Sequence, residues 1–213
     1  MGRMTAWWGE QVVPRATDVL LGTQEVEQLR ARVCEGLSGE VLELGFGSGL
    51  NVGHYPPEVE RVHAVEPSDV AWRIAERKHL RPHGPPVVRA GLDGQVLDLP
   101  EASVDTALST FTLCTIPDLG AALREVCRVL RPGGFFHFLE HGLAPDAGVA
   151  RWQRRLTPLQ RRVGAGCHLD RAVAEEVRVA GLCIDELETF YVDERLLPAR
   201  VFGHLYLGRA YRP

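Results

Sequence analysis

The chain has 213 residues, of which 45% are hydrophobic, and a formal net charge of −4. These values favour one globular domain with a sizeable core, and they speak against a basic surface that would hold nucleic-acid phosphates. Five cysteines are scattered without a Cys-x-x-Cys pair, so we expect free, mostly buried thiols and no bound metal. No basic leader and no run of about eighteen apolar residues is found, which predicts a cytoplasmic chain without an integral membrane segment.

Residues 1–38 are expected to form helical turns that lie over an edge of the sheet, as a cap on the domain. Trp7 and Trp8 are the large side chains of this segment. Such a pair can anchor a helix, but it can also close over a cofactor or hold a cationic acceptor by cation–π contact. Trp8 is therefore a candidate for substrate binding.

From Glu40 onward, β-rich runs alternate with helical patterns, which predicts a parallel sheet with helices on both faces. The expected strands lie near Val41–Leu44, Val62–Glu66, Val87–Ala90, Thr106–Ser109 and Phe135–Glu140. One helix is expected to begin at Ser68, and another to follow Asp118 as its N-cap and to stop at Arg131–Gly134.

After Gly142 the alternation ends. We expect a helix over Ala150–Val163, a loop over Gly164–Leu169 and a helix that Asp170 caps and that ends at Gly181. Two final strands, Cys183–Tyr191 and Arg200–Tyr211, are expected to form a hairpin. No internal repeat or inter-domain linker is visible in the sequence, so one domain is predicted.

The strongest local signal is the run VLELGFGSGLN, in which an apolar strand leads into Gly45, Gly47 and Gly49. Glycine permits positive φ and has no Cβ, so a ligand can lie against the main chain and the following helix N-terminus. A dinucleotide fingerprint would need a glycine where Leu50 stands. The pattern E-x-G-x-G-x-G, which begins at Glu43, instead resembles motif I of class I methyltransferases.

Glu66 ends the second predicted strand, about twenty residues after the first glycine. A carboxylate there can accept hydrogen bonds from both hydroxyls of a ribose. Nicotinamide enzymes and methyltransferases share this feature. Glu66 therefore indicates a methyltransferase only in combination with the glycine run before it.

The segments LDGQVLDLPEASVDTALSTFTLCTIPD and LREVCRVLRPGGFFHFLEHG extend the resemblance to residues 41–142, and the family is identified as methyltransferase type 11. The resemblance implies an α/β, Rossmann-like sheet of seven strands in the order 3-2-1-4-5-7-6, with only strand 7 antiparallel. It also implies a helical cap (1–38), a cofactor-binding core (39–142), and acceptor-side helices with a final hairpin (143–213), all in one domain. The cofactor would be S-adenosylmethionine, with S-adenosylhomocysteine as product.

In that family, an acidic side chain at the position of Asp93 faces the adenine amine, and residues 109–111 flank the methionine part. The implied donor-binding residues are Glu43, Gly45, Phe46, Gly47, Gly49, Asn51, Glu66, Pro67, Ser68, Asp93, Gly94, Ser109, Thr110 and Phe111.

Within the family, the runs FTLCTIP and CRVLRPGGFFHFLEHG and the segment Trp152–Arg171 are most similar to the thiol methyltransferase-like branch. The implied acceptor is a small molecule carrying a thiol, a hydroxyl or an amine. The implied substrate-binding residues are Trp8, Leu113, His141 and His168, and Cys114 is interpreted as a core residue.

His141 follows the fifth predicted strand, at a strand end that faces the acceptor in this architecture. A histidine has a pKa suited to a general base, so His141 is the candidate catalytic residue, with a structural role as the alternative. A nicotinamide-dependent oxidoreductase and a donor-binding module without catalysis remain open as functions. Whether the chain is a monomer or a homodimer is also left open.

Overall fold

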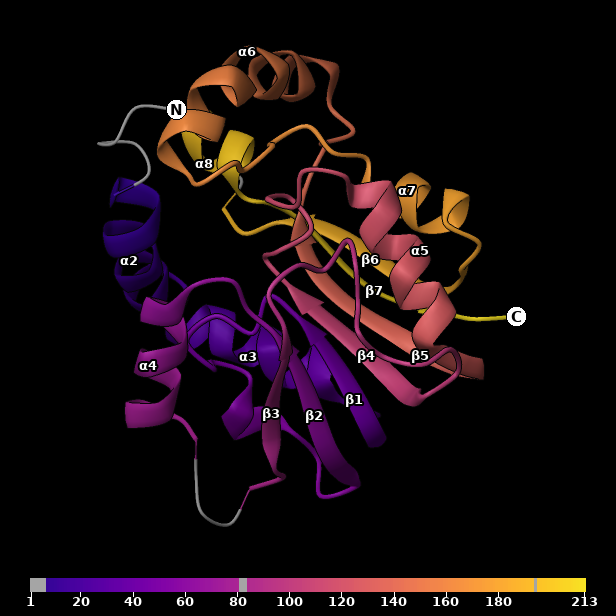
Figure 1. The fold of residues 1–213 in the computed structure, drawn as a ribbon. Coiled ribbons are helices and arrows are strands. Elements are labelled where there is room, and N and C mark those ends of the chain that lie inside the picture. Colours follow the sequence, from indigo (N-terminus) through magenta and orange to yellow (C-terminus); the bar gives the residue numbers. More distant parts are fainter. Residues whose placement is uncertain (1–6, 81–83, 194) are drawn as a thin grey trace.

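The computed structural model describes residues 7–80, 84–193 and 195–213. Its seven strands form one sheet in the order β3-β2-β1-β4-β5-β7-β6 (Figure 1). Strand β7 runs antiparallel to both of its neighbours, and the other pairs of adjacent strands are parallel. The expected Rossmann-like fold class is confirmed.

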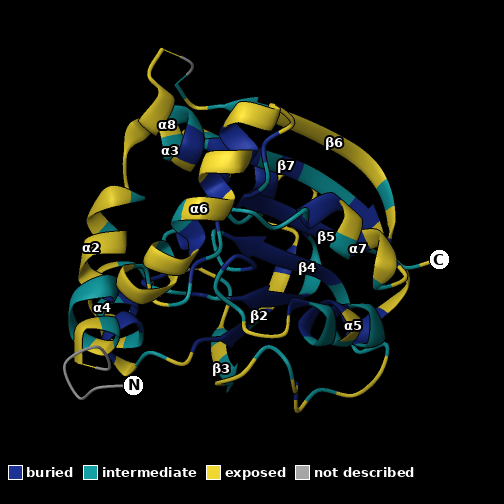
Figure 2. Ribbon diagram, turned by 90° about the horizontal axis from the view of Figure 1, so that it is seen from above, coloured by how far each residue is buried: buried dark blue, intermediate teal, exposed yellow. Residues whose placement is uncertain are grey.

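All five predicted parallel strands are present. Their ends differ most at the fifth strand, which begins at Leu130 and so includes the residues Arg131–Gly134 that were predicted to end the preceding helix. The strands are β1 (Gly39–Leu44), β2 (Val59–Val65), β3 (Val87–Gly91), β4 (Val104–Thr110), β5 (Leu130–His141), β6 (Cys183–Tyr191) and β7 (His204–Tyr211). Val41, Leu42 and Leu44 of β1 are buried, as expected for a central strand covered on both faces. Figure 2 shows the central strands buried and the edge strand β6 largely exposed.

Helices lie on both faces of the sheet and over the carboxyl ends of its parallel strands (Figure 1). They are η1 (Trp8–Val12), α2 (Val13–Leu20), α3 (Gln24–Cys34), η2 (Val52–His54), α4 (Asp69–Lys78), α5 (Leu119–Val129), α6 (Ala147–Val163), α7 (Val173–Val179) and α8 (Leu197–Phe202). The predicted N-caps of α4 and α5 are confirmed, because the Ser68 hydroxyl accepts from the Ala71 N–H and the Asp118 carboxylate accepts from the Ala121 N–H. No helix within the described ranges is both long and apolar enough to cross a bilayer.

Three sequence predictions about these elements are wrong in detail. Helix α7 begins after Ala172, and Asp170 instead accepts a hydrogen bond from the Thr157 hydroxyl at 2.8 Å. The segment predicted as a strand from Arg200 starts as α8, where Pro198 occupies the first turn, and β7 begins only at His204. Helix α3 covers a face of the sheet, not its edge: the ring of His137 on β5 donates to the Val33 carbonyl at 3.0 Å.

Candidate active site

A cavity of about 290 Å³ lies where the carboxyl ends of β1, β2 and β4 meet. Its floor comes from the loops that follow these three strands, and α2 covers one side. Ligands of open α/β sheets bind at this edge of the strands. Its lining includes Asp18, Arg30, Gly47, Glu66, Phe111 and Ala165.

The three predicted glycines have φ values between 59° and 81°, in the left-handed region. A Cβ on Gly45 would lie 2.0 Å from the Thr112 hydroxyl, so Gly45 is required by close packing within the protein. A Cβ on Gly47 would meet nothing closer than 3.8 Å. Since Gly47 lines the cavity, its bare main chain is open to a ligand.

Glu66 joins the glycine loop to the start of α4. Its carboxylate accepts from the Gly47 N–H at 2.7 Å and from the Ser68 N–H at 2.6 Å. The guanidinium of Arg89 donates to the Glu66 carbonyl at 2.8 and 2.9 Å, which fixes the backbone. Burial raises the pKa of Glu66, and the two backbone N–H groups and Arg89 oppose that shift. Each carboxylate oxygen still has a free acceptor position toward the cavity.

A buried polar network lies beneath the glycine loop and includes Arg30, which the sequence prediction missed. Arg30 donates to the side chains of Asn51 and Thr110 at 2.8 and 2.9 Å. Asn51 in turn donates to Glu43 at 2.7 Å, and the Tyr55 hydroxyl donates to the same carboxylate. Burial raises the pKa of Glu43 to about 7 although these donors oppose the shift. No local pattern around Arg30 indicates this role.

The predicted donor-site residues therefore fall into two groups. Gly45, Phe46, Gly47, Pro67, Ser68, Thr110 and Phe111 line the cavity together with Glu66. The others lie outside the lining within the described part of the chain: Glu43, Gly49, Asn51, Asp93, Gly94 and Ser109. The side-chain hydrogen bonds of Glu43, Asn51 and Ser109 and the close packing at Gly49 support the loops.

The loop after β4 is held in a strained shape at the cavity wall. Phe111 has a φ of 53°, which a non-glycine residue rarely adopts, and the Arg30 guanidinium lies 5.6 Å from its ring centroid. The buried Glu140 carboxylate accepts from the Ser109 hydroxyl at 2.8 Å and from the Thr112 N–H at 2.9 Å. These contacts stabilise the strained turn, which is typical of functional loops.

Asp93 and Gly94 follow β3 and lie beside Glu66 rather than in the cavity wall. The Glu66 N–H donates to the Gly91 carbonyl at 3.1 Å, which places this loop next to the carboxylate. The exposed Asp93 side chain accepts from the backbone and side chain of Gln95. A Cβ on Gly94 would lie 3.1 Å from Leu44, so the loop packs closely on the end of β1.

The N-terminal helices contribute residues that no motif indicated. Asp18 lines the cavity, and one of its oxygens is 2.5 Å from Lys78 on α4. The other oxygen, Oδ1, is buried without a hydrogen-bond partner among the described residues. Trp8 was predicted to bind substrate, but its indole donates to the Val163 carbonyl at 2.9 Å and thereby ties η1 to the end of α6.

The other predicted substrate residues also lie outside the cavity lining given by the described chain. Leu113 is fully buried in the main core. His168 donates through Nδ1 to the Cys114 carbonyl at 3.1 Å, so it holds a loop. His141 is 9% exposed, and its Nε2 lies 3.1 Å from the Cys167 sulfur. Their predicted roles in substrate binding therefore remain predictions, since none of the three side chains lines this cavity in the described part of the chain.

Cys114, His141 and Cys167 form a cluster whose ligand atoms all lie within 4.8 Å of one another. The neighbouring Cys114 thiol and, after it, His141 hold the pKa of Cys167 below its usual range, against the effect of burial. Burial lowers the pKa of His141, but its contact with Cys167 outweighs this and the net shift is upward. The sequence did not indicate metal-ligand partners for Cys167, because His141 and Cys114 stand 26 and more positions away along the chain.

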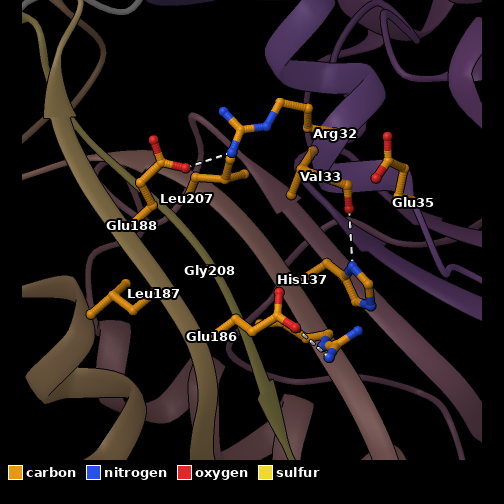
Figure 3. Close-up of a pocket in the computed structure, with 10 residues that line it drawn as sticks. Arg32, Val33, Glu35, His137, Glu186, Leu187, Glu188, Leu207 and Gly208 are labelled. Carbon is orange, nitrogen blue, oxygen red and sulfur yellow. Dashed lines mark hydrogen bonds and ion pairs between the residues drawn. The ribbon is translucent and has the colours of Figure 1, made fainter.

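A second hollow, of about 440 Å³, lies between α3 and the strands β6 and β7 (Figure 3). It is larger than the first, but it is not at the strand ends that carry the glycine loop. Four of its charged side chains already form pairs: Arg32 with Glu188 at 2.5 Å and Arg209 with Glu186 at 2.8 Å. The smaller cavity is therefore the candidate active site.

A family model described as a methyltransferase domain matches residues 42–138. Thiol S-methyltransferase TMT1A of Homo sapiens is 36% identical over 179 residues, which is 79% of this chain and 68% of that protein. Thiol S-methyltransferase TMT1B of Homo sapiens is 36% identical over 185 residues, 83% of this chain and 73% of that one. The rat TMT1B is 35% identical, and this chain spans 65% of its length.

Solved structures show the same fold at lower identity. A SAM-dependent methyltransferase of Thermotoga maritima superposes with a TM-score of 0.68 at 19% identity, covering 98% of this chain and 100% of that one. An S-adenosylmethionine-dependent methyltransferase of Mesorhizobium loti gives 0.64 at 22% identity, covering 91% and 100%.

Proposed function

The chain belongs to the methyltransferase domain family, and from this premise we propose that it transfers a methyl group from S-adenosylmethionine to a small thiol. One observation carries the donor assignment: the open main chain of Gly47 and the carboxylate of Glu66 face the same cavity. The relatives named above are thiol S-methyltransferases, which supports the acceptor class.

The lining residues, together with Asp93 on the neighbouring loop, offer polar groups that suit each part of the donor. Glu66 has free acceptor positions for the ribose hydroxyls, and Asp93 lies on the adjacent loop for the adenine amine. At the amino-acid end, Oδ1 of Asp18 lies 3.8 Å from the His79 Nε2 but accepts no hydrogen bond within the described residues, so it suits an ammonium group, and the guanidinium of Arg30 suits a carboxylate. A zwitterion would thus meet both charges that it needs.

When bound, the donor supplies an electrophilic methyl carbon on a sulfonium. The acceptor sulfur forms its bond to this carbon as the bond to the sulfonium sulfur breaks, and the thiol proton leaves to solvent. Holding the two partners in line can lower the barrier by roughly 7–11 kcal/mol. The residues that can do so are those of the strained loop around Phe111 and of the opposite wall at Ala165, which both line the cavity.

A thiol with a pKa of about 8.5 is partly ionised at neutral pH and needs less help from a base than a phenol with a pKa of about 10. His141, the predicted general base, contacts Cys167 and does not belong to the described cavity lining. The geometry therefore favours a thiol acceptor that loses its proton without a side-chain base.

Calorimetry and a turnover assay test the proposal together. Purified chain is titrated with S-adenosylmethionine and with a nicotinamide cofactor, and a panel of small thiols, phenols and amines is then assayed for release of S-adenosylhomocysteine. We expect uptake of the sulfonium donor alone and the fastest turnover with thiols. Tight donor binding without turnover of any acceptor would identify a binding module, and uptake of nicotinamide would identify an oxidoreductase.

Gly47→Val places a branched side chain in the cavity at a positive φ and should abolish donor binding. Gly53→Val is the matched control, since a Cβ there meets nothing within 4 Å and φ is not in the left-handed region. Equal donor affinity in both variants would overturn the site.

A further inference from the structure

We propose that Cys114, His141 and Cys167 form a binding site for one thiophilic divalent cation, with Zn²⁺ as the natural occupant. The three side chains come from the loop after β4, the end of β5 and the loop between α6 and α7. Their ligand atoms lie within 4.8 Å of one another, and the His141 Nε2 is 3.1 Å from the Cys167 sulfur. This site is separate from the donor cavity and does not depend on the identity of the acceptor.

The donor set and its spacing suit zinc. Two sulfurs and one imidazole nitrogen are the ligands that Zn²⁺ takes in proteins, at about 2.3 Å for sulfur and about 2.0 Å for nitrogen. Around a tetrahedral ion these bond lengths place neighbouring donors about 3.5–3.8 Å apart. The separation of 3.1 Å between His141 and Cys167 is slightly shorter than this range, and no pair of donors exceeds 4.8 Å, so small movements of the side chains would complete the coordination.

Hydrogen bonds hold the two cysteine loops against each other before any ion binds. The Cys114 carbonyl accepts from the His168 N–H at 2.9 Å and from its ring. Arg171 donates to the carbonyls of Leu113 and Ile116 on the same loop. Such outer contacts orient metal ligands and lower the cost of assembling a site.

The two cysteines are buried mainly among apolar side chains. Cys114 and Cys167 are 2% and 7% exposed and belong to a hydrophobic cluster with Ala144, Val149, Leu169 and Val201. The Cys114 thiol also donates to the Phe111 carbonyl at 3.8 Å, and the charged groups of Glu140 and Arg171 act on the cluster. A divalent cation would neutralise two thiolates in these buried surroundings. The other cysteines supply an internal comparison, because no described cluster joins Cys34, Cys127 or Cys183 to a histidine.

A bound ion would connect three segments that meet beside the active site. Thr115 and Ala165 line the donor cavity, and each lies within two residues of one of the two cysteines. Three protein ligands leave the fourth tetrahedral position for a water molecule. Metal binding would therefore fix the part of the cavity lining that Thr115 and Ala165 form.

The test uses the full chain, purified without chelator under reducing conditions, and measures metal content by native mass spectrometry and elemental analysis. Titration of the metal-free chain with Co²⁺ reports ligation directly, because thiolate coordination gives a sulfur-to-cobalt charge-transfer band in the near ultraviolet. We expect one ion per chain and an intense band. A reduced chain that takes up neither Zn²⁺ nor Co²⁺, or that binds Co²⁺ without the band, would overturn the proposal.

Cys114→Ser, Cys167→Ser and His141→Ala should each weaken Co²⁺ affinity by at least tenfold, whereas Cys127→Ala should leave it unchanged. Zn²⁺ should also raise the melting temperature of the wild-type chain and of Cys127→Ala, but not that of the cluster variants, because a ligand stabilises only the state that binds it. If a cluster variant does not fold, the wild-type titration still decides. Equal loss of affinity in Cys127→Ala, or no loss in any cluster variant, would refute the site.

Discussion

The donor side, which is the glycine loop with Glu66, and the acceptor side, which is the set of segments predicted to bind the acceptor, are held together in different ways. On the donor side, the contact that joins the glycine loop to Glu66 spans 19 positions of the chain, and both partners lie within three residues of the end of a strand. On the acceptor side, the contact of His168 with Cys114 spans 54 positions, and that of Trp8 with Val163 spans 155. Short motifs therefore predict the donor side, whereas the acceptor side forms only when distant segments of the chain fold together.

Arg30 gives the strongest test of that contrast, because it is a distant residue that serves the donor side. In Arg30→Met the side chains of Asn51 and Thr110 lose a buried charged partner. Breaking such a buried interaction should lower the free energy of unfolding by about 3–4 kcal/mol, and at this chain length the melting temperature should fall by about 6–16 °C. Thermal denaturation followed by circular dichroism measures the change.

Arg32→Met is the control, because Arg32 pairs with Glu188 at the surface and such pairs contribute little. A melting temperature that is equally lowered in both variants, or in neither, would show that the buried network has no special role. The donor side would then be stabilised only by residues close to its motif in the sequence.

The pH dependence of the free energy of unfolding tests the same buried polar network. Burial raises the pKa of Glu43 from its usual 4.5 to about 7, so the folded state holds this proton more tightly than the unfolded state does. The resulting stabilisation is complete below about pH 4.5 and is lost as the pH rises to about 7, amounting to about 3 kcal/mol. In Glu43→Gln this contribution is absent.

Urea unfolding of both proteins at pH 5 and pH 8 provides the measurement. The wild-type chain should lose stability relative to Glu43→Gln between the two pH values, and the common contribution of all other groups cancels in the difference. A difference that stays constant with pH would mean that Glu43 is ionised throughout.

Glu66→Ala tests the donor side where it touches the ligand. Loss of hydrogen bonds to a charged acceptor costs about 1.5–3 kcal/mol, so the Kd for S-adenosylmethionine should rise by roughly 10- to 100-fold. Calorimetry measures the affinity, and Glu60→Ala, which removes an exposed carboxylate from the same strand, is the control. Unchanged affinity in Glu66→Ala would remove this residue from the donor site.

Trp8→Phe should have the smallest effect, and it tests the most distant contact of the acceptor side. The variant keeps the ring but removes the exposed hydrogen bond to Val163, which contributes about 0.5–1 kcal/mol. Hydrogen exchange of the amides of η1 and α2 should become about two- to fivefold faster. Trp152→Phe on α6 is the control, and equal exchange in all three proteins would mean that the indole does not hold the N-terminal helices.

The fold was predictable because its signals are local. Apolar runs of strand length, the caps Ser68 and Asp118, and the glycines after β1 are each read from a few neighbouring residues. The errors arose where local preference and tertiary contact disagree. Asp170 is a good capping residue, but the Thr157 hydroxyl binds its carboxylate, and β7 could begin only where it pairs with β5.

The sequence by itself determined the strand order through family resemblance, the bare main chain at Gly47 and the carboxylate at Glu66. Only the tertiary structure decided that Cys114, His141 and Cys167 meet on the acceptor side. It alone also decided that Asp18 lines the donor cavity. The physical reason is range: backbone conformation is set by nearby residues, whereas contacts between loops depend on how the sheet and its helices pack.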